Sequence, residues 1–324
     1  MESDPLLLGA ALGFAVVNGM NDGGALVGAG LKVGGLPPAV AAGMLALALV
    51  VAPLVVGTQV AATLVHRLVS FSDVGGLVAG RTALLVAVGT AVVVVAVLSR
   101  RGLPTSLTLA LVGAITGAGI GGGLSVSLPT LGLVLGAGLA APVVGALGGF
   151  ALSRAGGLLP VTGRLSRRIR YAHVGAFSMQ CLAYAGNDGQ KMVAVLVVAT
   201  GATDGIDVSV PELLALAALF TGGLVAGLRP AAGMLSAEII PVRPPDAVAA
   251  EISSAGAVLA SAALGAPVSM TQSVAAALVG AGMSHGPRRV RWRAAGRLGL
   301  AWLFTLPVSA LLAGVLTRGG ALLS

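Results

Sequence analysis

Charged residues are scarce in this sequence. Asp, Glu, Lys and Arg make up 9% of its 324 residues, whereas a soluble domain usually carries about a quarter. A transmembrane helix needs about 20 mostly apolar residues. The longest stretches without any of the four charged types are close to that length or longer: 39–65, 82–99, 102–153, 252–284 and 298–317. The sequence therefore excludes a soluble fold and predicts a multi-pass protein of the cell membrane, surrounded by the lipid bilayer.

Other scarcities exclude further classes of protein. The single Cys181 excludes an internal disulfide. No acidic residue occurs between Asp73 and Asp188, so the Gly-x-Gly-x-x-Gly pattern at 117–122 lacks the acidic partner of a dinucleotide site. We find no nucleophile–base pair and expect neither an enzyme nor a cofactor. The three histidines show no metal-ligand spacing: His66, His173 and His285.

The apolar segments have the pattern of helices. Leu, Val, Ala and Gly run continuously in them, whereas barrel strands alternate apolar and polar residues. The 50 glycines suit closely packed membrane helices. Three pairs have the Gly-x-x-x-Gly spacing, which we interpret as helix packing: Gly24 with Gly28, Gly113 with Gly117, and Gly132 with Gly136.

The net charge of +8 does not indicate nucleic-acid binding, because the positive residues form short clusters between apolar runs. Such clusters are topology signals. The first residues include Glu2 and Asp4, which is the wrong sign for the start of a cleaved signal peptide. We therefore expect the first apolar run to remain in the protein.

Two polar landmarks recur along the chain in the same order. Asn21-Asp22 recurs as Asn187-Asp188, 166 positions later, and Pro104–Thr108 recurs as Pro267–Thr271, 163 positions later. The sequence therefore predicts a duplication, with a first repeat at 1–153, a basic cytoplasmic linker at 154–170 and a second repeat at 171–324.

The charges between these landmarks change sign from one repeat to the other. The first repeat begins with the acidic residues Glu2 and Asp4, whereas arginines precede the second repeat: Arg154, Arg164, Arg167, Arg168 and Arg170. After the first landmark, the first repeat carries a lysine and the second carries acids: Lys32 against Asp204, Asp207 and Glu212. After the second landmark, 121–129 is uncharged, whereas the equivalent loop is basic: Arg288, Arg289, Arg291 and Arg293.

Under the positive-inside rule, these differences give the repeats opposite orientations. Inverted repeats need an odd number of crossings each, and five fits the apolar runs. We predict an all-α polytopic membrane fold of about ten crossings with both termini outside, in which some segments are broken or re-entrant helices.

The Asn-Asp landmarks place polar groups inside apolar runs. An intramembrane carboxylate is costly and indicates function by default. Inverted repeats with interrupted helices are the common plan of secondary transporters. The oxygen ligands suit a coupling cation, sodium or a proton, and they are Asn18, Asn21, Asp22, Asn187 and Asp188. The alternative is that these residues only cap half-helices.

The Pro-x-Ser-x-Thr elements predict two helix starts, because proline ends a preceding helix and Ser or Thr caps a new one. The free N–H groups of a helix start attract anions. Two such starts, one from each repeat, predict an oxyanion site that is made by Ser106, Thr108, Ser269 and Thr271. Capping without a ligand is the alternative.

Three further polar residues complete the candidate set. Gln190 and Lys191 follow the second Asn-Asp pair, and we include both among the substrate-binding candidates. Lys191 can offset the charge of an anion, pair with Asp188, or extend to the membrane interface. Glu251 lies at the start of an apolar run, where a helix-end position also accounts for it.

These segments resemble the inorganic phosphate transporter family of PiT-type symporters. The two Asn-Asp segments resemble its paired signature, and the Pro-x-Ser segments resemble its Pro-Val-Ser-Thr-Thr-His element. Two shorter segments are also similar to segments of this family, Ala249–Glu251 and Ala301–Pro307, and the resemblance as a whole covers nearly the whole chain. The resemblance implies inward cotransport of inorganic phosphate with sodium, protons or a metal–phosphate complex.

The chain departs from this family at several site positions. Six positions carry a residue that differs from the one typical of the family: Ala25, Leu107, Leu109, Tyr184, Met270 and Gln272. Sulfate or another small oxyanion is therefore the alternative substrate. An ion channel and a non-transporting membrane scaffold are the alternatives from other classes, and a homo-oligomer is compatible with the sequence.

Overall fold

The computed structural model describes residues 4–31, 33–71, 77–100, 105–157, 165–201, 206–231 and 243–323. Several positions that were used for the orientation argument lie outside these residues, as does the first proline of the Pro-x-Ser elements: Glu2, Lys32, Pro104, Arg164 and Asp204. Within the described ranges, the predicted all-α fold is confirmed, and extended pairing is limited to one isolated bridge between Val69 and Val126.

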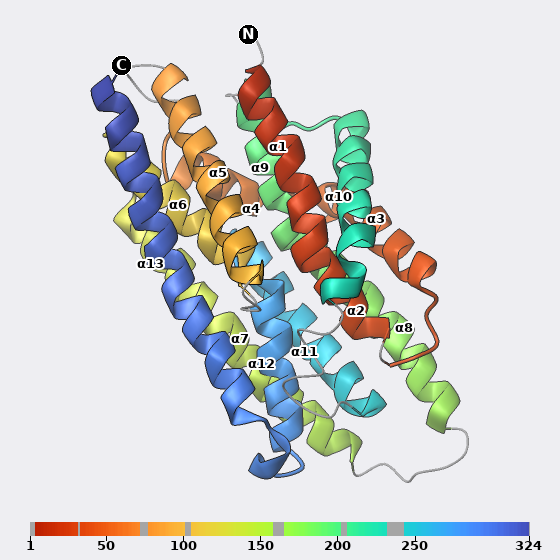
Figure 1. Cartoon of the computed structure of the whole chain (residues 1–324). Coiled ribbons are helices and arrows are strands. Elements are labelled where there is room, and N and C mark those ends of the chain that lie inside the picture. Colours follow the sequence, from red (N-terminus) through yellow and green to blue (C-terminus); the bar gives the residue numbers. More distant parts are fainter. Residues whose placement is uncertain are drawn as a thin grey trace.

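The helices follow one another along the chain and form one bundle (Figure 1). Those of the first half are α1 (Pro5–Asn18), η1 (Gly19–Gly23), α2 (Gly24–Leu31), α3 (Pro38–Val55), α4 (Gln59–Ala62), η2 (Thr63–Arg67), α5 (Leu77–Arg100), α6 (Leu107–Gly121) and α7 (Leu128–Gly156). Those of the second half are α8 (Leu165–Tyr184), η3 (Ala185–Gly189), α9 (Gln190–Thr200), α10 (Val210–Ala231), α11 (Pro244–Ala263), α12 (Met270–Met283), η4 (Pro287–Arg289) and α13 (Trp292–Leu323).

Six helical segments in the described part of the chain are long and apolar enough to cross a membrane. The helices α6 and α12 are apolar but shorter, with 15 and 14 residues. A helix of that length spans only about 22 Å, against about 30 Å for the hydrocarbon core. The structure therefore favours re-entrant segments at α6 and α12 over ten full crossings.

Serine caps begin both of these short helices. Ser106 precedes α6 and accepts a hydrogen bond from the Leu109 amide, and Ser269 precedes α12 and accepts one from the Gln272 amide. Both serines have extended backbone conformations, as N-cap residues do. The helix starts predicted from the Pro-x-Ser elements are therefore confirmed.

The Asn-Asp landmarks lie in continuous helices. Residues 19–23 and 185–189 form π-helical turns, η1 and η3, which join α1 to α2 and α8 to α9. The expected helix breaks at these two places are wrong. A π turn widens the helix by one residue, keeps its backbone hydrogen bonded and occurs frequently at functional sites. Widening thus places the carboxylates in the core without unwinding the chain.

The two halves pack in a reciprocal way. The short helix α6 packs against α13 of the other half, and the short helix α12 packs against α7. Likewise, α10 packs on α1, η1 and α2, while α3 packs on α8 and η3. This exchange is consistent with two repeats related by a two-fold axis.

The directions of the first helices also differ between the halves. In Figure 1, α1 descends from the N-terminus, whereas the α8–η3–α9 segment rises and ends beside the start of α1. The Asp4 amide donates to the Ala199 carbonyl at 3.2 Å, which joins the start of α1 to the end of α9. Both chain ends lie on the same side in this view. These directions are consistent with inverted repeats.

Glycines mark the closest helix contacts. A Cβ atom at Gly113 or Gly117 would lie 2.3 or 1.9 Å from backbone oxygens of α13, so these glycines allow α6 to touch that helix. Around Gly132 and Gly136, by contrast, such an atom would meet no other described atom within 4 Å. Helix packing is therefore confirmed for the pair on α6 and is wrong, within this chain, for the pair on α7.

Candidate functional site

A buried ion pair forms the centre of the site. The Lys191 Nζ atom lies 2.5 Å from Asp188 Oδ1, and both side chains are at most 2% exposed. Lys191 also donates to the Thr108 hydroxyl and, at 3.1 Å, to the Val268 carbonyl. The second Asp188 oxygen accepts from the Met270 amide at 3.1 Å. The ion pair therefore joins η3 and α9 to the start of both short helices.

Thr108 links the two repeats directly. Its hydroxyl lies 3.1 Å from Asp188 Oδ1 and 3.3 Å from the Val268 carbonyl. Thr108 belongs to α6, and Val268 is next to the N-cap of α12. Residues of the two Pro-x-Ser elements therefore lie in contact at one centre.

Asn187 holds the tip of the α11–α12 hairpin. Its amide nitrogen donates to the Ala266 carbonyl at 3.0 Å, and its amide oxygen accepts from the Val268 amide at 2.9 Å. Backbone groups at the tip of a hairpin lack helical hydrogen bonds, so they need other partners when the tip is buried. Asn187 therefore positions the start of α12 and has used its oxygen once already.

A pair of equivalent residues marks the contact between the landmarks. Asn18 and Tyr184 occupy matching places, 166 positions apart, and the Tyr184 hydroxyl donates to Asn18 Oδ1 at 2.9 Å. Equivalent residues of two-fold repeats can touch only near the axis. The Asn18 amide nitrogen is buried and has no hydrogen-bond partner among the residues that the structure describes. Among the described residues, this contact therefore leaves one buried donor unused.

Among the described residues, the side chains of Asn21 and Asp22 make fewer hydrogen bonds than those of Asn187 and Asp188. Asp22 is buried and accepts a hydrogen bond from the Asn21 side chain at 2.7 Å. The Asn21 oxygen lies 3.5 Å from the Ser99 hydroxyl. No cation lies within ion-pair distance of Asp22 in the described ranges, although it interacts electrostatically with Asp188 and Lys191.

The cap hydroxyls remain able to donate. A serine hydroxyl has one donor and two acceptor positions, and capping uses only an acceptor of Ser106 and of Ser269. Ser269 also lies 3.0 Å from the Thr271 hydroxyl, with either as the donor. All three side chains are buried. Capping and ligand binding are therefore compatible at these residues.

Gln190 faces a different part of the chain. Its amide oxygen accepts from the Val60 and Ala61 amides at 2.9 and 3.0 Å, at the start of α4. Its nitrogen donates to the Gly57 and Gly186 carbonyls at 2.7 and 2.6 Å. These bonds use all four positions of the amide, so Gln190 anchors α4 in this structure and has none left for a substrate.

Two histidine pairs were not found by sequence reasoning. His173 on α8 lies 2.9 Å from Glu251 on α11, with both buried, so Glu251 is more than a helix-end residue. His285 lies 2.8 Å from Asp246, which also accepts from Ser153 at 2.6 Å. The spacings of 78, 39 and 93 residues gave no local signal. Both pairs hold α11 to its neighbours.

Comparison with known proteins adds an independent observation. The model of the phosphate transporter family matches this chain over residues 18–159 and 158–313. The chain belongs to the phosphate transporter family. It is accordingly a multi-pass membrane transporter rather than an enzyme.

This chain has several bacterial relatives. It is 31% identical to a "probable low-affinity inorganic phosphate transporter" of Mycobacterium tuberculosis, over 95% of this chain and 75% of the relative. It is 32% identical to a protein of the same description from Mycobacterium leprae, over 92% and 73% of the two chains. The solved structure of a sodium-dependent phosphate transporter matches with a TM-score of 0.80 at 17% identity, over 98% of this chain and 99% of that one. That similarity shows a shared fold.

Proposed function

We propose that this protein imports inorganic phosphate as a symporter, with sodium or protons as the coupling ion. The family supports phosphate as the substrate, because the matching bacterial relatives are described as inorganic phosphate transporters. One structural observation carries the mechanism: the starts of α6 and α12 meet at Lys191.

This centre has the donors that a desolvated oxyanion requires. Helix starts offer free N–H groups, and Ser106, Thr108, Ser269 and Thr271 add hydroxyls. Lys191 adds a positive charge, but Asp188 holds it in the present structure. We propose that the incoming phosphate takes over part of the Lys191 contacts and that the hydroxyls turn toward it.

The coupling cation belongs at Asp22 in this proposal. The two landmarks differ in charge: the position that matches Lys191 in the first repeat is Ala25. Asp188 thus has a lysine of its own, whereas Asp22 has no cation within ion-pair distance among the described residues, and we propose that the coupling ion takes this place. Carboxylate and amide oxygens suit sodium, and protonation would neutralise the same group. The solved structure with the matching fold is described as sodium-dependent, which supports sodium.

Uptake into proteoliposomes tests the substrate and the ion together. Labelled phosphate and sulfate are each supplied with an inward sodium gradient, an inward proton gradient, or neither. We expect phosphate to accumulate above its external concentration under one of the two gradients, while sulfate does not. Accumulation of sulfate alone would assign the alternative substrate, and equilibration without accumulation would indicate a channel.

Variants at the cap hydroxyls test the anion site. Ser106→Ala and Ser269→Ala should each weaken phosphate binding by about 2- to 150-fold, which corresponds to about 0.5–3 kcal/mol for a lost donor. Thr116→Ala is the matched control, because its hydroxyl bonds only within α6. Unchanged binding in both serine variants would make these residues caps alone.

Variants at the first landmark test the cation site. Asp22→Asn should abolish gradient-driven uptake, and Ala25→Lys should make residual uptake independent of the coupling ion, because it supplies a fixed cation. Asp246→Asn is the control at a buried carboxylate of the His285 pair. If Asp22→Asn keeps the ion dependence of the parent, the cation lies elsewhere, whatever the identity of the anion.

A further inference from the structure

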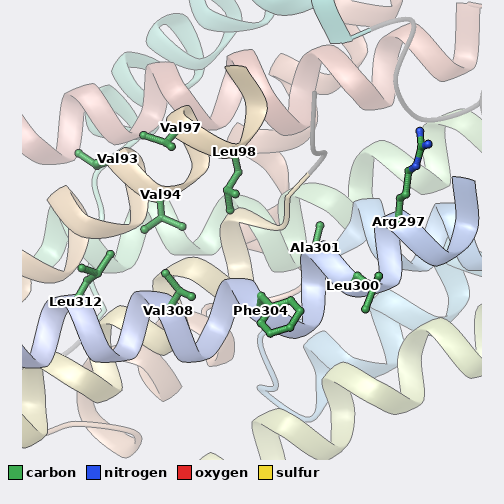
Figure 2. Close-up of a pocket in the computed structure, with 10 residues that line it drawn as sticks. All are labelled: Val93, Val94, Val97, Leu98, Arg297, Leu300, Ala301, Phe304, Val308 and Leu312. Atoms are coloured by element: carbon green, nitrogen blue, oxygen red, sulfur yellow. The ribbon is translucent and has the colours of Figure 1, made fainter. Parts of the chain in front are cut away.

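One groove of the bundle lies away from the central site. It runs between the last turns of α5 and the middle of α13 and has a volume of about 500 Å³. Nine of its ten lining residues are apolar, and the tenth is Arg297. Figure 2 shows the α5 and α13 side chains facing each other, with Arg297 at one end and Leu312 at the other.

The groove breaks the reciprocal packing of the two halves. In the second half of the chain, α11 of the α11–α12 hairpin lies directly on α7, where a Cβ atom at Gly148 would come within 2.8 Å of Ser253 Cβ. For the hairpin of the first half, α5 and α13 correspond to α11 and α7, and a groove lies open between them. Its floor contains the buried Val94 and Ala301, and its rim contains exposed side chains such as Phe304. Among the described residues, this apolar groove is therefore open toward the membrane.

The charge at one end of the groove is unbalanced. Arg297 is exposed, and within the described part of the chain it has no hydrogen bond or ion pair. The sequence contains no Asp or Glu after Glu251. The same end of α13 and the turn before it carry four more arginines: Arg288, Arg289, Arg291 and Arg293. Among the described residues, none therefore balances the charge of Arg297.

The dimensions suit a chain-like ligand. From Arg297 to Leu312, α13 rises by about 22 Å, which is longer than one leaflet of a hydrocarbon core about 30 Å thick. Basic pockets between transmembrane helices bind the headgroups of anionic lipids. We propose that this groove binds one acyl chain of an anionic phospholipid, whose phosphate-containing headgroup pairs with Arg297. A second copy of this chain fits less well, because it would bury an unpaired guanidinium.

Native mass spectrometry of the purified protein tests this site. The probes are phosphatidylglycerol and phosphatidylcholine with identical acyl chains, each added to protein that has been cleared of lipid in mild detergent. We expect the parent to retain one phosphatidylglycerol molecule in preference to phosphatidylcholine. Arg297→Gln should weaken phosphatidylglycerol retention roughly fivefold, the effect of one basic residue at an anionic surface. Arg293→Gln, one turn earlier, is the matched control and should have a smaller effect.

A second variant separates the acyl chain from the headgroup. Ala301→Phe fills the floor of the groove and should reduce retention of both lipids, while the helical content and elution volume of the protein stay unchanged. Equal retention of the two lipids by the parent, or equal losses in the two arginine variants, would overturn the headgroup assignment. A dimer that Ala301→Phe dissociates would identify a second copy of the chain as the occupant instead.

Discussion

At the scale of single residues, Asp188 and Lys191 have to be considered together. Removing one partner of a buried ion pair leaves a charge without compensation, which costs about 3–5 kcal/mol. Asp188→Asn should therefore lower the melting temperature of the purified protein as well as abolish uptake. Lys191→Met in the same chain should restore most of the stability, but not uptake.

Thermal unfolding in detergent and uptake in proteoliposomes, measured on the same variants, separate these two effects. Ser178→Ala is a suitable control, since Ser178 is exposed on α8 and bonds only to the Val174 carbonyl. If the double variant transports phosphate, the pair is a structural link and not a part of the transport site.

Gln190 distinguishes anchoring from substrate binding. Gln190→Ala would leave two carbonyls and the Val60 and Ala61 amides without their present partner. Each buried group that stays unsatisfied costs about 1–3 kcal/mol. We expect a loss of stability and a reduced amount of folded protein, with unchanged phosphate affinity in the fraction that folds.

Phosphate binding to that fraction can be measured by equilibrium dialysis with labelled phosphate. A lower affinity at parental stability would show the reverse, namely that Gln190 binds substrate and that its contacts to α4 are replaceable.

At the scale of helices, close glycine contacts set the position of the hairpins. A Cβ atom at Gly117 would lie 1.9 Å from the Ala310 carbonyl, and one at Gly280 would lie 1.9 Å from the Ala146 carbonyl. Gly117→Ala and Gly280→Ala should therefore force α6 from α13 and α12 from α7, at a cost of about 1–3 kcal/mol each. Gly132→Ala meets no described atom within 4 Å and should leave stability unchanged or raise it slightly.

The melting temperatures of these three variants provide the measurement. Similar losses for Gly117→Ala and Gly280→Ala would match the reciprocal packing of the halves. A loss for Gly132→Ala as large as the other two would mean that α7 has a partner on that face.

What the sequence could predict follows from how local each signal is. The helix starts at Ser106 and Ser269 were predictable, because a cap depends on a few adjacent residues. The π turns were not, because Asn, Asp and Gly favour a break and a wider turn alike. The pairing of His173 with Glu251 joins residues 78 positions apart and left no pattern. The glycine spacing on α7 is the same as on α6, but spacing alone does not identify the face that another helix covers.

At the scale of the whole molecule, the prediction that remains is the side of the membrane that each loop occupies. Both landmarks recur at nearly one offset, which predicts a duplication, and the change in loop charge predicts the inversion. The structure adds that α1 starts where α9 ends, with Asp4 bonded to Ala199. The N-terminus and the loop that contains Asp207 must therefore lie on one side, which the acidic residues predict to be the outside.

Single cysteines in a Cys181→Ala background test this topology. Ser125→Cys and Asp207→Cys should react with a membrane-impermeant maleimide on intact cells. Arg168→Cys and Arg288→Cys should react only after permeabilisation, because basic loops remain inside. All four positions are exposed, so failure to react would reflect the side of the membrane and not burial. The deciding pair is Ser125 and Arg288, since each follows the short helix of its own half; labelling of both from the same side would exclude inverted repeats.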